Sequence, residues 1–594
     1  MRIRRVDIEN FRGIKAASWR LAPDRRFLAL IGPGDSTKTT VLTALERALH
    51  DRDGLSVLDT DFYDANVDNP IRIRVAVDEL PDDLIAMDAF GRFLAGIDDD
   101  GEWTHDPVDE TQRCVIVEFL VEADLEPIWQ AYRPPLEGLD DVEQQPIRAR
   151  LRAGMAAYRI DDRIDAHLRW SRTSALGKLT ASRDDTRSTL TLAGRAARDA
   201  AAGAVTEALK TLAKEVRKQA QAIGTTEFAD LKPGLDVSLT NTQGNLALFE
   251  GNVPLTNFGL GTRRLTGAAT QQLANHGSST LLVDEVEHGL EPHRLVHLLG
   301  TLRTSGGFSQ VFVTTHSPTA LQHLEPDELV LVRSTNGVTD LRPLDDPAEL
   351  RSLLKASPEA FLARRIVICE GKTEYGVVLE LLDEWNRGTD VGPAPSAALG
   401  VVAVEGNGGT GSAAWAEQFL KVGYEVVLFM DSDDEAANRL VPKIKELGGV
   451  VVRWSGSHSI ETAVCAQLDE IGLASLIRAA LDVADDRDAA AQSFAATLTA
   501  KGAPAASPGV DPLLATTWAA AGIGLERARE IIGAVAKERA WFKRVDKGRR
   551  LGRFVLDTPA VQQGEVKERR DELKAAIFAR PKGSVSPDPE RPGV

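Results

Sequence analysis

The feature that most constrains the fold of this chain is the segment GPGDSTKTT at residues 32–40. It follows an apolar run with strand character, RRFLALIG, and opens a stretch with helical character, KTTVLTALERALHD. Backbone N–H groups at the start of a helix point at bound anions, so a glycine-containing strand-to-helix loop is the context that a phosphate site requires. The sequence predicts an α/β domain that binds a nucleotide, with an ordinary structural turn as the alternative.

Two side chains of this loop have expected contacts with ATP. We expect Lys38 to reach the β and γ phosphates, and the hydroxyl of Thr39 to hold Mg²⁺. Backbone N–H groups from Gly34 to Thr39 would cradle the phosphates. The predicted ATP-binding residues of the loop are Gly32, Gly34, Asp35, Ser36, Thr37, Lys38, Thr39 and Thr40.

One residue of the loop departs from the phosphate-loop pattern, because Thr37 stands where a glycine is expected. A β-branched residue is unfavourable wherever the backbone needs a positive φ or a close approach to the ligand. The sequence therefore predicts nucleotide binding and leaves hydrolysis open.

Three later segments supply partners for the loop. The strand-like run LLVDE ends in Asp284, a candidate Mg²⁺ ligand, and Glu285, which could activate an attacking water. After the apolar run VFVTT, His316 could sense the γ-phosphate. Gly261 lies in the turn NFGLGTRRL and could contact a nucleotide bound by the opposite subunit. A capped strand end and a structural histidine are the alternatives.

Together with ENFRG near the start, these motifs occur in a characteristic order. The first part of the chain resembles the ABC-type ATPase heads of the SMC and RecF kind. In that family two heads enclose two ATP molecules, so the resemblance implies a homodimer or a higher homo-oligomer. Residues 91–225 read as Ala-, Arg- and Asp-rich helices, and lie where relatives carry dimerising insertions. A solvated helical decoration is the alternative reading of this segment.

A second group of carboxylates follows two further apolar runs. EGKTE comes after RRIVIC, and DSDDE comes after VVLFM. Carboxylates at one edge of a sheet repel one another unless cations lie between them, so this pattern favours a Mg²⁺ or Mn²⁺ site. Acidic turns at strand ends are the alternative. The candidate metal ligands are Glu370, Glu374, Asp431, Asp433 and Glu435.

The order EGKTE, the glycine turn EGNGGTG and then DSDDE resembles a Toprim domain. An ABC head with a helical insertion followed by Toprim resembles the OLD (overcoming lysogenisation defect) family nucleases, which include the nuclease subunit of Gabija antiphage systems. The resemblance implies a DNA endonuclease that uses two Mg²⁺ or Mn²⁺ ions. It also implies Glu461 as a further metal ligand and a catalytic lysine, for which Lys543 is preferred to Lys547. The expected catalytic residues are Glu370, Asp431, Asp433, Lys543 and Glu285.

The net charge of −18 argues against a general nucleic-acid coat, so any DNA contact must be local. The densest basic stretch is WFKRVDKGRRLGRF. A solvated basic face is the equally weighted alternative. The predicted DNA-binding residues are Lys543, Arg544, Lys547, Arg549 and Arg550.

The expected fold is α/β: an ABC-type ATPase head with an inserted helical dimerisation module, a Toprim domain and a helical C-terminal region. The expected segments are the first part of the ATPase at 1–90, the helical insertion at 91–225, the second part of the ATPase at 226–360, Toprim at 361–460, the helical region at 461–580 and a disordered tail at 581–594.

The remaining expectations concern location and function. The three cysteines form no CxxC pair, no signal peptide is evident, and no apolar run is long enough to span a bilayer, so we expect a cytoplasmic protein. We expect an ATP-regulated DNA endonuclease in antiphage defence or DNA metabolism, with DNA as its partner and a helicase as a candidate partner. One alternative is an SMC- or RecF-like repair ATPase whose Toprim domain binds DNA or a partner without cutting. Another is a nucleotide sensor in which hydrolysis plays no part.

Overall fold

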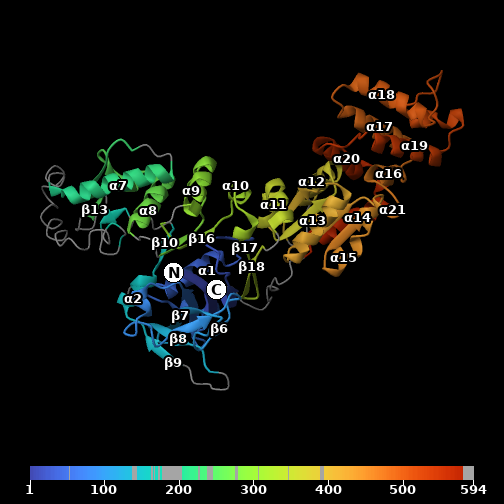
Figure 1. The fold of residues 1–594 in the computed structure, drawn as a ribbon. Helices are drawn as coiled ribbons and strands as arrows, with labels where there is room; N and C mark the ends of the chain where they lie inside the picture. The colour runs from blue at the N-terminus through green and yellow to red at the C-terminus, as the bar shows by residue number, and fades with distance from the viewer. Residues whose placement is uncertain are drawn as a thin grey trace, which may run out of the picture. The chain divides into compact units, whose positions relative to one another are not determined.

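A computed structural model describes residues 1–51, 54–136, 143–161, 165, 168–170, 174, 176, 204–224, 228–236, 245–274, 279–304, 307–344, 347–387 and 394–579. The chain divides into two compact units, Met1–Arg351 and Ser352–Val594 (Figure 1). The predicted mixed α/β class with helical regions is confirmed for the described residues.

The large sheet of the first unit has a parallel half and an antiparallel half. The parallel half runs in the order β10-β15-β16-β3-β17, and β18 links it to the antiparallel half, β2-β1-β4-β7-β8. Short strands β5, β6 and β9 extend the antiparallel side. The bounds are β1 (Arg2–Phe11), β2 (Ile14–Arg20), β3 (Phe27–Ile31), β4 (Ile71–Asp78), β5 (Ala95–Ile97), β6 (Trp103–Thr104), β7 (Gln112–Val121), β8 (Pro127–Arg133), β9 (Glu143–Pro146), β10 (Ala157–Ile160), β15 (Thr280–Val283), β16 (Gln310–Thr314), β17 (Leu329–Thr335) and β18 (Val338–Pro343).

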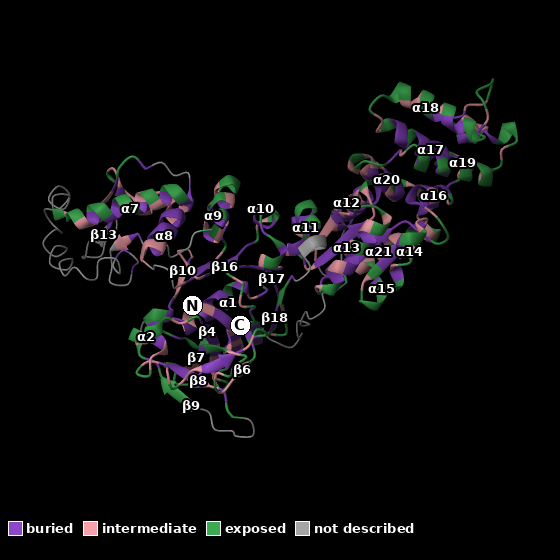
Figure 2. Cartoon of the chain, in the orientation of Figure 1, coloured by how far each residue is buried: buried purple, intermediate pink, exposed green. Residues whose placement is uncertain are grey.

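The parallel half forms because its strands are apolar along their whole length. Every residue of β3, β15 and β16 is buried, as expected for parallel strands covered on both faces (Figure 2). The phosphate loop follows β3 and Asp284 follows β15, and both strands run parallel to β16, so the loop and the Asp284 segment lie at the same edge of the sheet. The helices of this unit are α1 (Lys38–Ala48), α2 (Asp82–Ile85), α3 (Ala149–Arg152), α7 (Glu207–Ile223), α8 (Leu260–Ala274), α9 (Pro292–Thr304) and α10 (Pro318–Gln322), and α11 (Pro347–Ala356) spans the boundary between the units.

The prediction of a helical insertion at 91–225 is wrong for its first part. Described residues between 95 and 133 are mainly strands, and β7 and β8 extend the antiparallel half beside β4. The runs QRCVIVEFLV and PIWQAYR are rich in β-branched and aromatic residues, which favour a half-buried strand. Helix α7 fits the expectation, whereas most residues between 162 and 203 lie outside the described ones. The predicted dimerising role of this segment stays a prediction.

A small antiparallel sheet packs near α7. Strand β13 pairs with β11, β12 and β14, and α7 contacts both α8 and β12. Apolar residues three or four positions apart along α7 form its buried face, which includes Leu209, Leu212, Val216 and Ile223. The bounds are β11 (Arg169–Trp170), β12 (Leu231–Asp236), β13 (Asn245–Glu250) and β14 (Val253–Pro254).

The second unit is built on a four-stranded parallel sheet in the order β20-β19-β21-β22. Its core joins this sheet to the helices that follow it, and Trp454, Trp518 and Phe542 are among the buried side chains. The strands are β19 (Arg365–Cys369), β20 (Val401–Glu405), β21 (Glu425–Met430) and β22 (Val450–Arg453). The helices are α12 (Lys372–Arg387), α13 (Gly409–Lys421), α14 (Glu435–Asn438), α15 (Val441–Glu446), α16 (Ile460–Cys465), α17 (Glu470–Asp482), α18 (Arg487–Ala500), α19 (Leu525–Glu538), α20 (Val545–Asp557) and α21 (Gly564–Ile577).

All three cysteines are buried thiols without disulfide partners. A search of the described residues finds no helix with the length and apolar character needed to cross a bilayer. The tail at 581–594, predicted to be disordered, lies outside the described residues.

Candidate functional site

The phosphate loop connects β3 to α1, and its lysine folds back onto the loop. Nζ of Lys38 donates hydrogen bonds to the carbonyl oxygens of Gly32 and Pro33, at 3.1 and 2.8 Å, and to Oγ of Ser36 at 3.0 Å. Burial lowers the pKa of Lys38 to about 8, although Asp35 and Asp284 oppose the shift. A buried cation whose hydrogen-bond acceptors are carbonyl and hydroxyl oxygens is poorly compensated, so an anionic phosphate would be a better partner.

The backbone conformation of the loop explains why a glycine is expected at Thr37. Thr37 has φ 68°, in the left-handed region, as the first-turn cap of α1. Its hydroxyl donates to the carbonyl oxygen of Ser36 at 2.6 Å and lies 3.0 Å from Oγ1 of Thr339 on β18. These two hydroxyl contacts offset the cost of a β-branched residue at positive φ. The expected conflict at Thr37 is therefore present, and the surrounding structure compensates for it.

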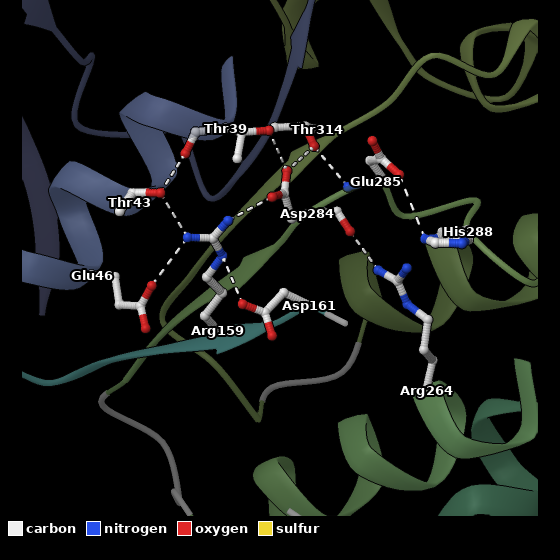
Figure 3. A network of polar contacts seen from close by, with 10 residues as sticks. All are labelled: Thr39, Thr43, Glu46, Arg159, Asp161, Arg264, Asp284, Glu285, His288 and Thr314. Atoms are coloured by element: carbon white, nitrogen blue, oxygen red, sulfur yellow. Dashed lines mark hydrogen bonds and ion pairs between the residues drawn. The ribbon is translucent and has the colours of Figure 1, made fainter. Parts of the chain in front are cut away.

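The carboxylate of Asp284, directly after β15, is held from both sides (Figure 3). Oδ1 accepts hydrogen bonds from the hydroxyls of Thr39, at 3.0 Å, and Thr314, at 2.8 Å. Oδ2 lies 2.5 Å from Nη2 of Arg159 on β10. The structure thus joins Thr39 and Asp284, the two residues predicted to hold Mg²⁺. Both are oxygen donors, which suits Mg²⁺.

The neighbouring carboxylates and histidine face the same edge of the sheet. Glu285 has φ 47°, its backbone N–H donates to Oγ1 of Thr314 at 2.7 Å, and its Oε2 lies 3.5 Å from Nδ1 of His288. The backbone N–H of His316 donates to Glu287 at 2.6 Å, and Thr315 donates to the same carboxylate at 2.8 Å. Burial lowers the pKa of His316, and the charge of Lys38 lowers it further. The sequence analysis did not identify Glu287, although DEVE carries it three residues after Asp284.

The glycine of the NFGLGTRRL turn makes a close contact within the same unit. A Cβ on Gly261 would lie 2.3 Å from the carbonyl oxygen of Gly289, so only glycine fits at this position. One turn later on α8, Arg264 donates to the carbonyl oxygen of Asp284. The start of α8 is therefore fixed beside the Asp284 segment. The predicted contact of Gly261 with a nucleotide of another subunit stays a prediction.

Comparison with known proteins bears on this unit. Residues 27–322, just under half of the chain, match the family model described as "AAA domain, putative AbiEii toxin, Type IV TA system". The match begins at β3 and includes the phosphate loop, Asp284 and His316. Residues 27–322 form an ATPase domain. No curated protein matches the chain.

Solved structures similar to the chain include SMC heads of low sequence identity. An SMC head bound to the C-terminal winged-helix domain of ScpA has 13% identity and a TM-score of 0.35, covering 58% of this chain and 97% of that one. The SMC head domain from Thermotoga maritima has 11% identity and a TM-score of 0.29, covering 58% and 100%. An SMC head with an extended coiled coil, bound to the ScpA C-terminal domain derived from Pyrococcus furiosus, has 14% identity and a TM-score of 0.35, covering 60% and 99%.

Outside the ATPase domain, the second unit gathers carboxylates at the carboxyl edge of its sheet. Glu370 follows β19 and Asp431 follows β21, its neighbour in the sheet. The backbone N–H of Asp431 donates to Oε2 of Glu370 at 2.8 Å, and Oδ1 of Asp431 accepts from the N–H of Ile460 at 2.9 Å. Ser459, the N-cap of α16, donates to Glu461 at 3.0 Å. Residues far apart in sequence therefore meet here.

Burial and mutual repulsion make these carboxyl groups hard to ionise. Burial, followed by the charges of Glu374, Glu370, Glu461 and Asp433, raises the pKa of Asp431 to about 10. Burial also raises the pKa of Glu374 to about 8, with Glu461 as the next cause. Burial is also the main cause that raises the pKa values of Glu370 and Glu461. Such a cluster requires protons or cations to be stable.

One of the acidic residues after β21, Glu435, behaves differently from the prediction. The side chain of Glu435 is 92% exposed, and its nearest cation is Arg439 at 4.0 Å, so Glu435 does not join the cluster. It is the first residue of α14, and this position directs it to solvent. Asp434 instead caps α14, by accepting from the N–H groups of Ala436 and Ala437. The predicted ligand role of Glu435 is therefore not supported by its position.

A lysine that the sequence analysis missed approaches the cluster. Lys537, on α19, donates to the carboxylate of Asp433. This hydrogen bond raises the pKa of Lys537, and the charges of Asp433, Asp431 and Glu461 raise it further. The charge of Lys543 also acts on Glu461 and opposes the rise of its pKa. Lys537 was missed because only the packing of α19 against α16 brings it to the site.

The arginines predicted to bind DNA are engaged within the unit. Arg544 pairs with Asp485 and Asp546, and Arg550 lies 3.4 Å from Asp482. The carboxylates of α12 hold two more arginines of α20: Arg549 pairs with Glu380 and Asp383, and Arg553 pairs with Glu380 and Glu384. These arginines therefore fasten α20 to its neighbours, and binding to phosphates would compete with those ion pairs.

Divalent cations are the group that the carboxylate cluster implies. In the described part of the chain, no three or more His, Cys, Asp or Glu side chains are already arranged at metal-ligand geometry. The donor set itself fits a hard cation, because it consists of carboxylate oxygens on adjacent strand ends and on two helices, α12 and α16. Binding would therefore require the side chains to draw together around the ions.

Proposed function

We propose that the second unit is a Toprim-type nuclease domain that hydrolyses DNA phosphodiester bonds with Mg²⁺ or Mn²⁺, and that ATP bound by the ATPase domain controls it. The observation that carries the proposal is the cluster of Glu370, Glu374, Asp431, Asp433 and Glu461, in which burial and like charges raise the pKa of Asp431 to about 10. Strongly shifted pKa values of this kind are concentrated at functional sites, so the cluster supports a functional role.

The residues of the cluster have separable roles in this proposal. Glu370, Glu374, Asp431, Asp433 and Glu461 would hold the cations. When bound, divalent cations activate water and stabilise the leaving 3′ oxygen of a phosphodiester. Lys537 and Lys543 would donate to the anionic phosphate as charge builds up on it, since both already act on the carboxylates of this site.

In the ATPase domain, Lys38 and the loop N–H groups would bind the phosphates, with Thr39 and Asp284 as the Mg²⁺ residues. Glu285 would orient the attacking water, and His316 would contact the γ-phosphate. Thr37 is strained but compensated by its hydroxyl contacts, so its conformation is compatible with nucleotide binding, and hydrolysis is a separate question. The proposal also includes binding of DNA by Lys543 and Lys547. It further includes a homodimer, a helicase partner and a role in antiphage defence. The toxin named in the description of the matched family model is compatible with a defence role.

The test is cleavage of supercoiled plasmid by the full chain, with Mg²⁺ or Mn²⁺ and with or without ATP. We expect Asp431→Asn to lower cleavage by at least about 10³-fold, because it removes a metal-binding charge at the centre of the site. Asp488→Asn, at an exposed position on α18, is the matched control. Full cleavage by Asp431→Asn contradicts the nuclease assignment.

Control by ATP is tested in the same assay with Lys38→Ala. The variant should bind no ATP and should cleave at one rate whether or not ATP is present, whereas native cleavage changes on ATP addition. If native cleavage ignores ATP, the two activities are independent. DNA retention by the native chain without cleavage under any metal condition would favour the alternative, a Toprim domain that binds DNA without cutting it.

A further inference from the structure

Arg159 occupies an unusual place in the ATPase domain. It lies on β10, which pairs in parallel with β15, and its side chain is only 8% exposed. Nη2 lies 2.5 Å from Oδ2 of Asp284, and Nη1 donates to Oγ1 of Thr43 at 2.8 Å and to Glu46 at 3.1 Å. Nε lies 3.6 Å from Asp161 (Figure 3). One guanidinium thus ties the helix after the phosphate loop to the end of the Asp284 strand.

The position of this guanidinium matters because of which carboxylate it neutralises. Asp284 is the residue proposed to face Mg²⁺, and Thr39 is its partner in that role. With two hydroxyls on Oδ1 and an arginine on Oδ2, the charge of Asp284 is balanced by a fixed cation of the chain itself. Arg159 is also linked to Thr39 through Thr43. The hydroxyl of Thr43 accepts from Arg159 and donates to the carbonyl oxygen of Thr39 at 2.8 Å.

We propose that Arg159 is the resident counter-cation of the ATP site, and that a divalent cation arriving with the nucleotide competes with it for Asp284. The inference rests on the assignment of Asp284 in the proposed function. It implies that ATP binding by this chain requires a higher Mg²⁺ concentration than it would without the charge of Arg159. One positive charge within about 4 Å of a divalent cation changes the affinity for that cation by on the order of tenfold or more.

The test measures the affinity of the full chain for a fluorescent ATP analogue while Mg²⁺ is varied from chelated to saturating. Arg159→Gln removes the charge and keeps a polar side chain. We expect half-maximal stimulation by Mg²⁺ at a concentration at least about tenfold lower than in the native chain. Arg159→Lys, which keeps the charge, should stay near the native value. Arg342→Gln, at an exposed arginine on β18, is the matched control.

Glu46→Gln provides a second variant with the opposite expected sign. Glu46 shares the guanidinium with Asp284, so neutralising it should strengthen the hold of Arg159 on Asp284 and raise the Mg²⁺ requirement. This variant decides the matter if Arg159→Gln does not fold.

The outcomes separate the inference from the proposed function. If native and Arg159→Gln proteins bind the analogue with the same Mg²⁺ dependence, the counter-cation role is wrong and the ATP site stands. If Arg159→Gln loses affinity equally with chelator and with Mg²⁺, Arg159 contacts the nucleotide and the inference is wrong. If the native chain does not bind the analogue at all, the assignment of the ATP site fails and the inference fails with it.

Discussion

At the scale of single residues, Thr37 illustrates how a local conflict is compensated. A threonine at φ 68° costs about 1–2 kcal/mol relative to an unstrained residue. Hydrogen bonds of its hydroxyl to Ser36 and Thr339 offset this cost, at about 1 kcal/mol each. The hydroxyl, more than the backbone, therefore decides whether the loop keeps its shape.

Substitutions at Thr37 should separate these contributions. Thr37→Val keeps the β-branched shape at positive φ but removes the hydroxyl, so we expect ATP affinity to fall about tenfold. Thr37→Gly removes the strain and the hydroxyl together, and its affinity should stay within a few-fold of native. Titration with a fluorescent ATP analogue measures both. Equal losses in the two variants would show that strain does not matter here.

The raised carboxyl pKa values predict how stability depends on pH once metal is removed. The pKa of Asp431 rises from 3.8 to about 10 and that of Glu374 from 4.5 to about 8 on folding. The folded chain therefore binds more protons than the unfolded chain between these values. Stability from these groups is fully present below about pH 4 and is lost as pH rises through 8 and 10.

In chelator, the unfolding temperature of the second unit should therefore fall by several degrees from about pH 6 to about pH 9. Asp431→Asn should flatten this dependence, because an amide does not ionise, and added Mn²⁺ should reverse it in the native chain. Thermal unfolding at the two pH values is the measurement. A native chain that gains stability over this range would contradict the assigned shifts.

At the scale of elements, α12 and α20 approach each other through glycines. A Cβ on Gly548 would lie 2.6 Å from the carbonyl oxygen of Thr373, and one on Gly376 would lie 2.4 Å from that of Val545. Ion pairs between the two helices flank this contact. Since α12 carries Glu374 and Lys543 precedes α20, the glycine contact fixes the spacing of groups in the carboxylate site.

Enlarging this contact should damage the second unit. Gly548→Val inserts a branched side chain against backbone atoms, so we expect a loss of about 3 kcal/mol in the free energy of unfolding. Gly524→Ala is the matched control, because nothing lies within 4 Å of a Cβ at that position. Urea denaturation measures both. A Gly548→Val protein of native stability would mean that the helices can separate without cost.

At the scale of the whole molecule, two compact units carry two different sites. The ATP site lies within residues 1–351 and the carboxylate site within 352–594. The hydrophobic cores of the two units share no residue among those described. Ligands of one site should therefore stabilise mainly its own unit.

Calorimetry of the full chain should resolve two unfolding transitions with different ligand responses. ATP at 100-fold its Kd should stabilise one transition by ~2.7 kcal/mol, and Mn²⁺ without nucleotide should stabilise the other. Lys38→Ala should abolish the first response alone, and Asp431→Asn the second alone. A single transition that responds to both ligands would show that the units unfold together.

The sequence by itself determined the features that depend on local order along the chain. An apolar strand, a glycine-containing loop and a helix must follow one another for phosphate binding, and they do so at residues 27–48. Carboxylates placed directly after parallel strands meet at one edge, so Glu370 with Asp431 was predictable from their positions. The strands between 95 and 133 were not predicted, because the segment 91–225 was treated as one unit and the Ala- and Arg-rich sequence after these strands favours helix.

The tertiary structure alone decided which side chains complete each site. Arg159 reaches Asp284 across 125 residues, and Lys537 reaches Asp433 across 104, and neither has a local signal. The tertiary structure also places Glu435 in solvent, outside the cluster, and pairs Arg549 and Arg553 of α20 with Glu380 of α12. The sequence gives the charge of each side chain, but the helix or strand that packs against that side chain determines its ion-pair partner.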